Sequence, residues 1–429
     1  MGWLVVSVLG FGMIVSMRLS IFAFGTWFSP LTHYLVRWLF LVVLFQLNLL
    51  DYYPVSTITW IVILGSAFAF TVGAFLPMAI ADRTKTKPVG HIRNTLSESI
   101  YPGRLRGGIL LLFLAGLALF AVFIQNMPGS PNPFEALSML TEVRSAMKEE
   151  SIPGFHYFYL MELVVYLCFL HVLLWGKRTP VWIVFVGLSA VFSLVYTTGK
   201  VNIAKAIMWC FFAVLYMEVF RLRSTRILKW LGCLAVGGVV IFSLLVTNER
   251  SDLRSVGRGE NANATMLLAY LYMSIPVGVL DKLLGDPQVR PVYGAYMFSP
   301  ILKMIRGMGV PVVIPSHIGE FYNTPMPANI ATYLDLMYKD FGLIGVSVIP
   351  FIIGFVCSYC FAKLRAPNIA LFGFSINTIL ALTVFGSTGA ANYVKPSYWF
   401  QVFALLLLSK YVLRSRSGVV HAPAYAGAQ

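Results

Sequence analysis

The feature that most constrains this chain is a series of apolar runs, each close to the length that crosses a bilayer. A membrane-spanning helix needs about 20 mostly apolar residues. Such runs lie at residues 2–17, 32–50, 57–80, 107–125, 155–175, 181–196, 201–220, 230–247, 342–362, 369–390 and 397–413. Only 11% of all residues are charged, whereas soluble domains have about 25%. The sequence therefore predicts an all-α, polytopic transmembrane helical bundle with about 11 spans, and it excludes a soluble enzyme.

Basic residues mark one side of the predicted membrane. The formal net charge is +15, and basic clusters lie at 83–106, 177–178, 221–229, 363–365 and 410–416. The order of spans puts all of these clusters on one side, which the positive-inside rule assigns to the cytoplasm. The long segment 248–341, on the other side, holds eight basic and eight acidic residues. The excess charge therefore reflects membrane topology and does not indicate nucleic-acid binding.

The runs divide the chain into three parts. Residues 1–247 form N-terminal transmembrane helices (about eight spans), 248–341 a large extracytoplasmic loop, and 342–429 C-terminal helices (about three spans) with a short tail. In segment 126–154, Asn132 and Pro133 begin a predicted amphipathic helix. The apolar stretches 264–280 and 292–302 are interrupted by Pro or Gly. Their sequences are compatible with interfacial helices, re-entrant segments or short spans. The first run lacks a basic flank before it, so we interpret it as a span and not as a signal peptide.

No motif for a nucleotide or a metal stands out. The chain has no GxxxxGK[ST], GxGxxG or HExxH pattern. All five cysteines lie in apolar runs, where we expect free thiols even for the pair Cys357 and Cys360. We therefore expect no cofactor and no metal, and any chemistry should use a substrate that is already activated.

Basic residues beside two spans are candidates for binding phosphate. Arg250 and Arg254 follow the run that ends at residue 247, and a guanidinium can bind two phosphate oxygens at once. Interfacial pairing of Arg250 with a neighbouring acid is the alternative. Lys200 lies at an outer hairpin tip, where the positive-inside rule disfavours it, whereas we expect Lys205 to extend toward lipid headgroups.

Polar segments near residue 320 supply the candidates for proton transfer and sugar binding. His317 and Glu320 lie in a turn-rich run, where an imidazole or a carboxylate could act as a catalytic base. Five residues before the span at 342 have side chains suited to sugar hydroxyls, namely Asn329, Tyr333, Asp335, Tyr338 and Asp340. An ordinary helix-surface pair of Asp335 with Lys339 and interfacial tyrosines are the alternatives. Gly342 and Gly345 would mark the start of the next span.

These residues give the chain a resemblance to the bacterial oligosaccharide repeat-unit polymerases, the Wzy-type O-antigen polymerases. The resemblance rests on Ser29-Pro30-Leu31, Asp51–Ser56, Thr198-Gly199-Lys200 and a late pattern from Asn329 to Gly345 that contains Tyr338-Lys339-Asp340-Phe341-Gly342. Lys200 stands where many members of that family carry arginine. The match covers most of the chain in layout and few residues in identity.

The resemblance implies a fold, a place and a reaction. Such proteins are GT-C-like helical bundles of the bacterial inner membrane that act at the periplasmic face without a nucleotide. They join repeat units carried on undecaprenyl diphosphate, which leaves as the acceptor hydroxyl attacks the anomeric carbon. Expected partners are these lipid-linked units, the bilayer, a chain-length regulator and the flippase of the same pathway. In this chain Arg250, Arg254 and Lys200 would hold the diphosphate, and His317 or Glu320 would be the base.

Two other functions remain open. An O-antigen ligase transfers the finished polymer to lipid A-core and has a similar layout. A lipid-linked oligosaccharide transporter would place polar residues near the middle of the membrane, often in repeated halves. Here charges in the middle of the runs are few, since Arg37, Glu162 and Glu218 lie near predicted ends, and no internal repeat is evident. The polar residues concentrate in the outer loop, so the sequence favours an enzyme.

Overall fold

A computed structural model shows an almost entirely helical protein. It describes residues 1–80, 92–126, 154, 156–196, 200–218, 270–315, 321–324, 327–329, 332–364, 369–388 and 394–412. The N-terminal helices are α1 (Gly2–Phe24), α2 (Pro30–Leu47), α3 (Thr57–Ile80), α4 (Ile92–Ser99), α5 (Pro102–Gln125), α8 (Tyr157–Trp175), α9 (Val181–Val195) and α10 (Lys200–Glu218). They are followed by α13 (Pro276–Leu284), α14 (Ser299–Gly307), strands β1 (Tyr322–Asn323) and β2 (Pro327–Ala328), α15 (Tyr333–Lys363), α16 (Leu371–Gly386) and α17 (Pro396–Val412).

Six helices in the described part of the chain are long and apolar enough to cross a membrane. They are α1, α2, α3, α5, α8 (with the turn to Arg178) and α15. Shorter apolar helices at Val181–Val195, Asn202–Met217 and Leu371–Gly386 match three more predicted runs. The predicted run 230–247, the amphipathic segment 127–153 and Cys233 lie outside the described residues. The other four cysteines are free thiols, as expected.

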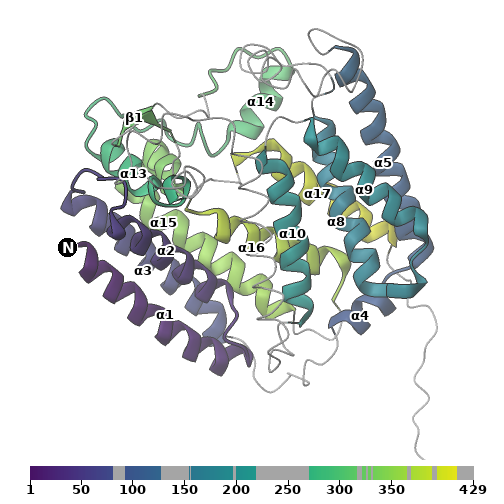
Figure 1. The fold of residues 1–429 in the computed structure, drawn as a ribbon, viewed down its shortest axis with the longest axis horizontal. Helices are drawn as coiled ribbons and strands as arrows, with labels where there is room; N and C mark the ends of the chain where they lie inside the picture. Colours follow the sequence, from purple (N-terminus) through teal and green to yellow (C-terminus); the bar gives the residue numbers. More distant parts are fainter. Residues whose placement is uncertain are drawn as a thin grey trace, which may run out of the picture.

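The long helices form two groups that are joined by α16 (Figure 1). In one group α3 packs along α15, with α1 and α2 beside them. In the other, α8 contacts α5, α9, α10 and α17. Since α16 contacts α2, α10, α15 and α17, helices from the first and last thirds of the sequence share one core.

Helix α15 is kinked and is not one straight helix. Gly342 has φ 61° and ψ −146°, a conformation outside the helical region and accessible mainly to glycine. The bend is sharp, because Gly345 lies directly against the backbone carbonyl of Met337, eight residues earlier. A short helix over residues 333–341 therefore precedes the long segment 343–363. Gly342 marks a helix boundary, and the start of a membrane span at this residue stays a prediction.

Glycines also allow α3 and α15 to approach closely. A Cβ atom at Gly73 would collide with the carbonyl group of Phe351, and one at Gly354 with the carbonyl group of Phe70. Both collisions involve backbone, which cannot swing away as a side chain can. Small residues of this kind let helix backbones touch, as they do in membrane-spanning pairs.

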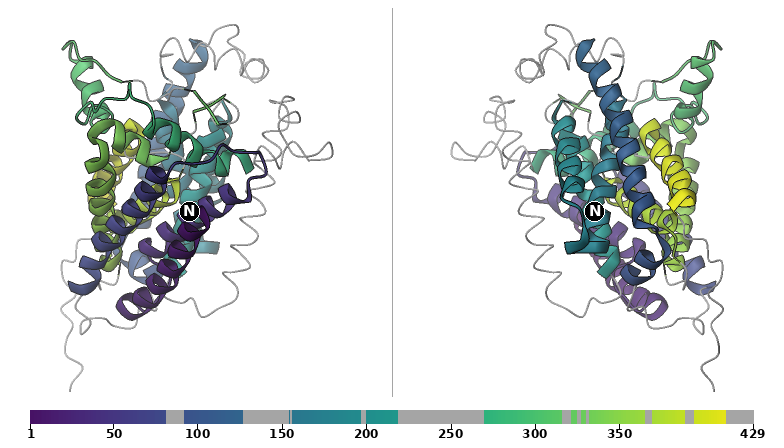
Figure 2. Two further views of the ribbon diagram at one scale, coloured as in Figure 1. Left: turned by 90° about the vertical axis from the view of Figure 1, so that its left-hand side faces the viewer. Right: turned by 90° about the vertical axis from the view of Figure 1, so that its right-hand side faces the viewer.

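The segment that includes α13 and α14 lies at the end of the bundle where α3, α8, α10 and α17 begin, which we call the upper end (Figures 1 and 2). Asp281 on α13 accepts hydrogen bonds from the amide and hydroxyl of Ser56 (2.8 and 2.6 Å) and from the hydroxyl of Thr59 (2.8 Å). It thereby caps the start of α3. Both α13 and α14 have nine residues, too few to span a bilayer.

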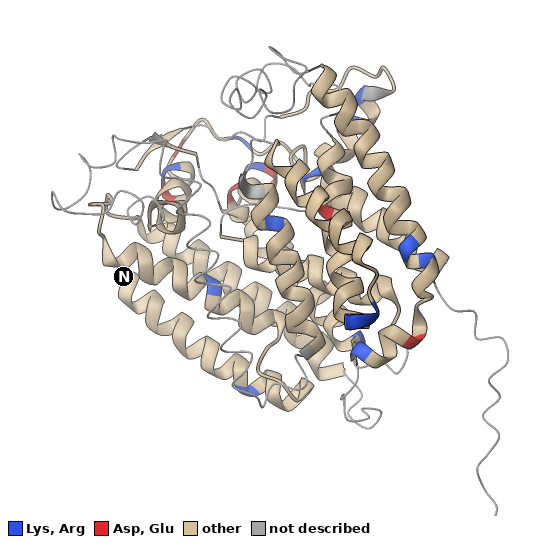
Figure 3. Ribbon diagram, turned by 45° about the vertical axis from the view of Figure 1, so that its right-hand side comes forward, with Lys and Arg blue, Asp and Glu red and all other residues tan. Residues whose placement is uncertain are grey.

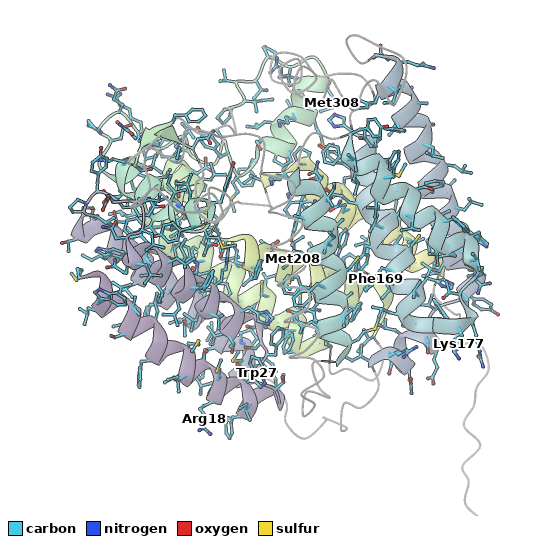
Figure 4. The ribbon with its side chains drawn as sticks, viewed as in Figure 1. Arg18, Trp27, Phe169, Lys177, Met208 and Met308 are labelled. Atoms are coloured by element: carbon cyan, nitrogen blue, oxygen red, sulfur yellow. The ribbon has the colours of Figure 1, made fainter. Side chains whose placement is uncertain are left out.

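Basic residues gather at the opposite, lower end. Arg93 donates to the Leu174 carbonyl, Arg104 to the Tyr411 carbonyl and Arg106 to the Arg178 carbonyl. These carbonyls lie at the last turns of α8 and α17 or just after them, where guanidinium groups satisfy exposed acceptors. Arg18 and Lys177 are at the same end, whereas Met308 is at the upper end (Figure 4). The described members of the predicted cytoplasmic clusters thus share one end of the bundle.

Candidate functional site

Three polar residues lie at the same depth in the second helix group. Glu162 on α8, Lys205 on α10 and Gln401 on α17 each follow the first residue of their helix by five positions. The three helices begin at the upper end, so the side chains meet about one and a half turns inside it. Few other charges lie along the long helices (Figure 3). Polar groups inside membrane-spanning segments are costly and commonly functional.

The three side chains form one hydrogen-bonded unit. Lys205 Nζ and Gln401 Nε2 both lie 2.6 Å from Glu162 Oε2. Lys205 Nζ also donates to Gln401 Oε1 at 3.3 Å. Glu162 is fully buried and the Lys205 side chain is 10% exposed. Glu162 Oε1 has no hydrogen-bond partner among the described residues.

A second lysine adds positive charge to this unit. Lys395 lies directly before α17, and its electrostatic interactions include Lys205 and Glu162. Burial lowers the pKa of the Lys395 ammonium, the charge of Lys205 lowers it further, and Glu162 opposes both effects. We call Glu162, Lys205, Lys395 and Gln401 the Glu162 cluster. The cluster thus contains two lysines and one carboxylate.

Two further basic groups, Lys303 and His156, lie at the upper end of the bundle. Helix α14 is held there by the Ser299 hydroxyl, which donates to the Val394 carbonyl at 3.2 Å. Burial lowers the pKa of Lys303 on α14. Burial, and then the nearby charge of Lys303, lower the pKa of His156, directly before α8. Desolvated cations at the end of an apolar bundle can bind an anion that lies at a membrane surface.

The structure describes only some of the residues that were predicted to bind the diphosphate or to act as the base. Lys200 is the first residue of α10, one and a half turns above Lys205. Arg250, Arg254, His317 and Glu320 lie outside the described residues. The expectation that Lys205 extends to lipid headgroups is wrong. Its ammonium group turns inward, because a buried carboxylate and the Gln401 amide offer it stronger partners.

The residues predicted to bind sugar lie before and within the short helix 333–341. The hydroxyls of Tyr333 and Tyr34 lie 2.7 Å apart. Asp335 accepts from the amide and hydroxyl of Thr332 and thus caps the helix. Asp340 accepts from the amides of Tyr296 (2.9 Å) and Met297 (2.8 Å). These polar groups make hydrogen bonds within the protein that stabilise its fold. Asn329 and Tyr338 are half-buried, and sugar contact by any of the five residues stays a prediction.

Comparison with known proteins found no matching family model, no matching curated protein and no matching solved structure. In the part of the chain that the structure describes, no three His, Cys, Asp or Glu side chains are grouped as metal ligands. The inference of function therefore depends on the sequence resemblance and on the Glu162 cluster.

The sequence carries a partial signal for this cluster. Each of three apolar runs has a charged or amide residue soon after its start, Glu162 seven positions after residue 155, and Lys205 and Gln401 four positions after residues 201 and 397. The ion pair could not be assigned from this spacing, because the contacts join residues 43 and 239 positions apart in the chain. Only the packing of α8 against α10 and α17 brings them together.

Proposed function

We propose that the chain is a bacterial inner-membrane polysaccharide polymerase that joins undecaprenyl-diphosphate-linked oligosaccharide repeat units. The observation that supports this best is the Glu162 cluster, which brings two lysines to the end of the bundle opposite the basic cytoplasmic clusters. A lipid-linked diphosphate has its charge at the membrane surface, at the level of such a cluster. The proposed fold is a GT-C-like bundle of about 11 spans with a long periplasmic loop.

In the proposed reaction the activation comes from the lipid carrier. An acceptor hydroxyl attacks the anomeric carbon of the donor chain, a glycosidic bond forms, and the bond from that carbon to the diphosphate oxygen breaks. Lys205 and Lys395, together with Lys200, Arg250 and Arg254, stabilise the charge that develops on the diphosphate. His317 or Glu320 takes the proton of the hydroxyl. Neither a metal nor a nucleotide is needed.

Glu162 has a supporting part in this arrangement. Its carboxylate fixes the Lys205 ammonium inside the bundle and pairs it with Gln401 from a third helix. A lysine held in one place binds a charge without first losing side-chain freedom. The proposed partners are the lipid-linked repeat units, a chain-length regulator and the flippase of the pathway.

The test is a clean deletion of the gene in its source strain, followed by electrophoresis of the extracted surface polysaccharide. We expect the ladder to vanish while core with a single repeat unit remains, and the wild-type gene should restore the ladder. Complementation by Lys205→Met or Lys395→Met should fail at equal protein levels. An unchanged ladder in the deletion strain would refute the polymerase. Polymer that stays on the lipid carrier and never reaches the core would instead show an O-antigen ligase.

One observation favours a transporter as the second candidate. A helix that is interrupted at Gly342 resembles the broken helices of secondary transporters, which leave their ends free for substrates. Here the Tyr333 amide donates to the Ser387 carbonyl at 2.8 Å, and Thr332 with Asp335 caps the next amides. The helix start is thus occupied by the protein itself. A flippase would leave lipid-linked units on the cytoplasmic side in the deletion strain, with no unit attached to the core.

A further inference from the structure

A second group of polar atoms, separate from the Glu162 cluster, is buried without partners between α2 and the end of α16. Arg37 Nε, Ser387 Oγ and Thr388 Oγ1 are inaccessible to solvent and have no hydrogen-bond partner among the described residues. Ser387 and Thr388 are each 1% exposed. Arg37 itself is partly buried and forms no ion pair within the described ranges.

Three independent contacts place these atoms in one region. The guanidinium carbon of Arg37 lies 4.8 Å from the ring centre of Phe385, two residues before Ser387. The Ser387 carbonyl accepts from the Tyr333 amide at 2.8 Å. The Tyr333 ring centre lies 6.3 Å from that of Trp38, the residue after Arg37. The end of α16 is therefore in contact with the face of α2 that carries Arg37.

An acceptor with negative charge would satisfy the buried guanidinium of Arg37 best. A guanidinium has five N–H donors in a fork that matches the oxygens of a carboxylate or a phosphate. The Phe385 ring offers Arg37 only a weaker cation–π contact. Lys205, the comparable cation of the second helix group, pairs with the Glu162 carboxylate, whereas no acid among the described residues pairs with Arg37. Buried hydroxyls in protein interiors are also usually hydrogen-bonded.

We propose that Arg37, with Ser387 and Thr388, binds an anionic oxygen group of a ligand, either a phosphate of a lipid carrier or the carboxylate of an acidic sugar. The guanidinium binds two oxygens of the anion, and the two hydroxyls bind the anion or the adjacent sugar hydroxyls. The start of the helix at Tyr333 takes no part, because its amides are already capped. The identity of the natural ligand rests on the proposed function, but the test below measures binding and not polymer synthesis.

The experiment is calorimetric titration of the full chain in lipid nanodiscs with two matched pairs of probes. Farnesyl diphosphate is compared with farnesol, and glucuronate with glucose. The variants are Arg37→Gln, Arg37→Lys and Ser387→Ala, with Arg18→Gln as the control. Arg18 is an exposed arginine at the lower end, so its removal changes the net charge equally without affecting the proposed site.

We expect one anionic probe to bind the wild type and its neutral counterpart to bind far more weakly. Arg37→Gln should weaken that binding by about tenfold or more, Arg37→Lys by less, and Arg18→Gln not at all. Ser387→Ala should also weaken it while leaving the thermal unfolding midpoint unchanged, because no described residue bonds to its hydroxyl. The anion that responds identifies the source.

Two results would overturn the proposal. One is equal affinity of the wild type, Arg37→Gln and Ser387→Ala for both anions. The other is a wild type that binds neither anion. The ladder assay measures polymerisation separately. A negative titration therefore does not affect the proposed polymerase function. A negative ladder assay, in turn, does not affect the anion site, which the titration tests.

Discussion

The contact between α3 and α15 and the contact among α8, α10 and α17 are built from different residues. The first is closed by glycines, so that helix backbones touch at Gly73 and Gly354. The second contains a buried ion pair, where Lys205 Nζ lies 2.6 Å from Glu162 Oε2. Glycine packing brings only stability, whereas a buried charge is expensive and well-packed apolar residues could replace it. This difference is the reason that we propose a functional role for the second contact and a structural role for the first.

The largest effect should follow from breaking the ion pair. Lys205→Met leaves the Glu162 carboxylate buried without its cation, and loss of one partner of a buried pair costs about 3–5 kcal/mol. We expect a large fall in the unfolding temperature of the purified protein and no polymer ladder in cells.

The double variant Glu162→Gln with Lys205→Met separates stability from function. With both charges gone, the free energy of unfolding should recover most of the loss, but polymer synthesis should stay absent. A double variant that restores the ladder would reduce the pair to a structural role and remove the contrast between the two contacts.

Gly73→Ala should have the next largest effect. The added methyl group meets the Phe351 carbonyl, so α3 and α15 must separate, and overpacking of this kind costs about 1–3 kcal/mol. Gly65→Ala, on the same helix, is the matched control because its Cβ would point into open space. Thermal unfolding of both variants is the measurement. Equal midpoints for the two would mean that the helices are not in backbone contact.

Tyr333→Phe should have a smaller effect, confined to stability. It removes the hydrogen bond between the Tyr333 and Tyr34 hydroxyls, which contributes about 1 kcal/mol. Unfolding should shift by a few degrees while the polysaccharide ladder stays normal. Loss of the ladder at unchanged stability would instead support the predicted sugar contact and extend the functional site into the first helix group.

The smallest effect concerns pH and His156. Burial and Lys303 hold the pKa of the folded imidazole below the ordinary 6.5, so the unfolded state binds the proton more readily. The free energy of unfolding is therefore at its full value above the pKa of His156 in the unfolded chain. It declines as the pH falls from that pKa through the lower pKa of His156 in the folded protein. The unfolding temperature should drop less steeply from about pH 7 to about pH 5 in His156→Gln than in the wild type. An identical slope would place His156 in ordinary solvent.

The chain's local features were predictable where a single residue or run decides them. Ser29 and Pro30 begin α2 because the serine hydroxyl accepts from the Thr32 amide and proline suits the first turn. Gly342 ends one helix and begins another because few other residues adopt its backbone angles. The inward turn of Lys205 was not predictable in this way. Whether Lys205 extends to lipid headgroups or pairs with an acid depends on which helix packs beside α10, and that helix is distant in the sequence.

The sequence by itself determined the class of protein, a helical membrane protein, and it predicts that the basic clusters share one side. Long apolar runs with so few charges are stable as helices packed in a bilayer. The order of these runs along the chain is enough to put all the basic clusters on one side. The tertiary structure alone decided which polar residues meet. Glu162, Lys205 and Gln401 are brought together by the packing of three helices, and the packing of α2 against α16 gives Arg37 no acidic partner among the described residues. Hydropathy acts locally along the chain, whereas the pairing of charges depends on distances that only the packed bundle sets.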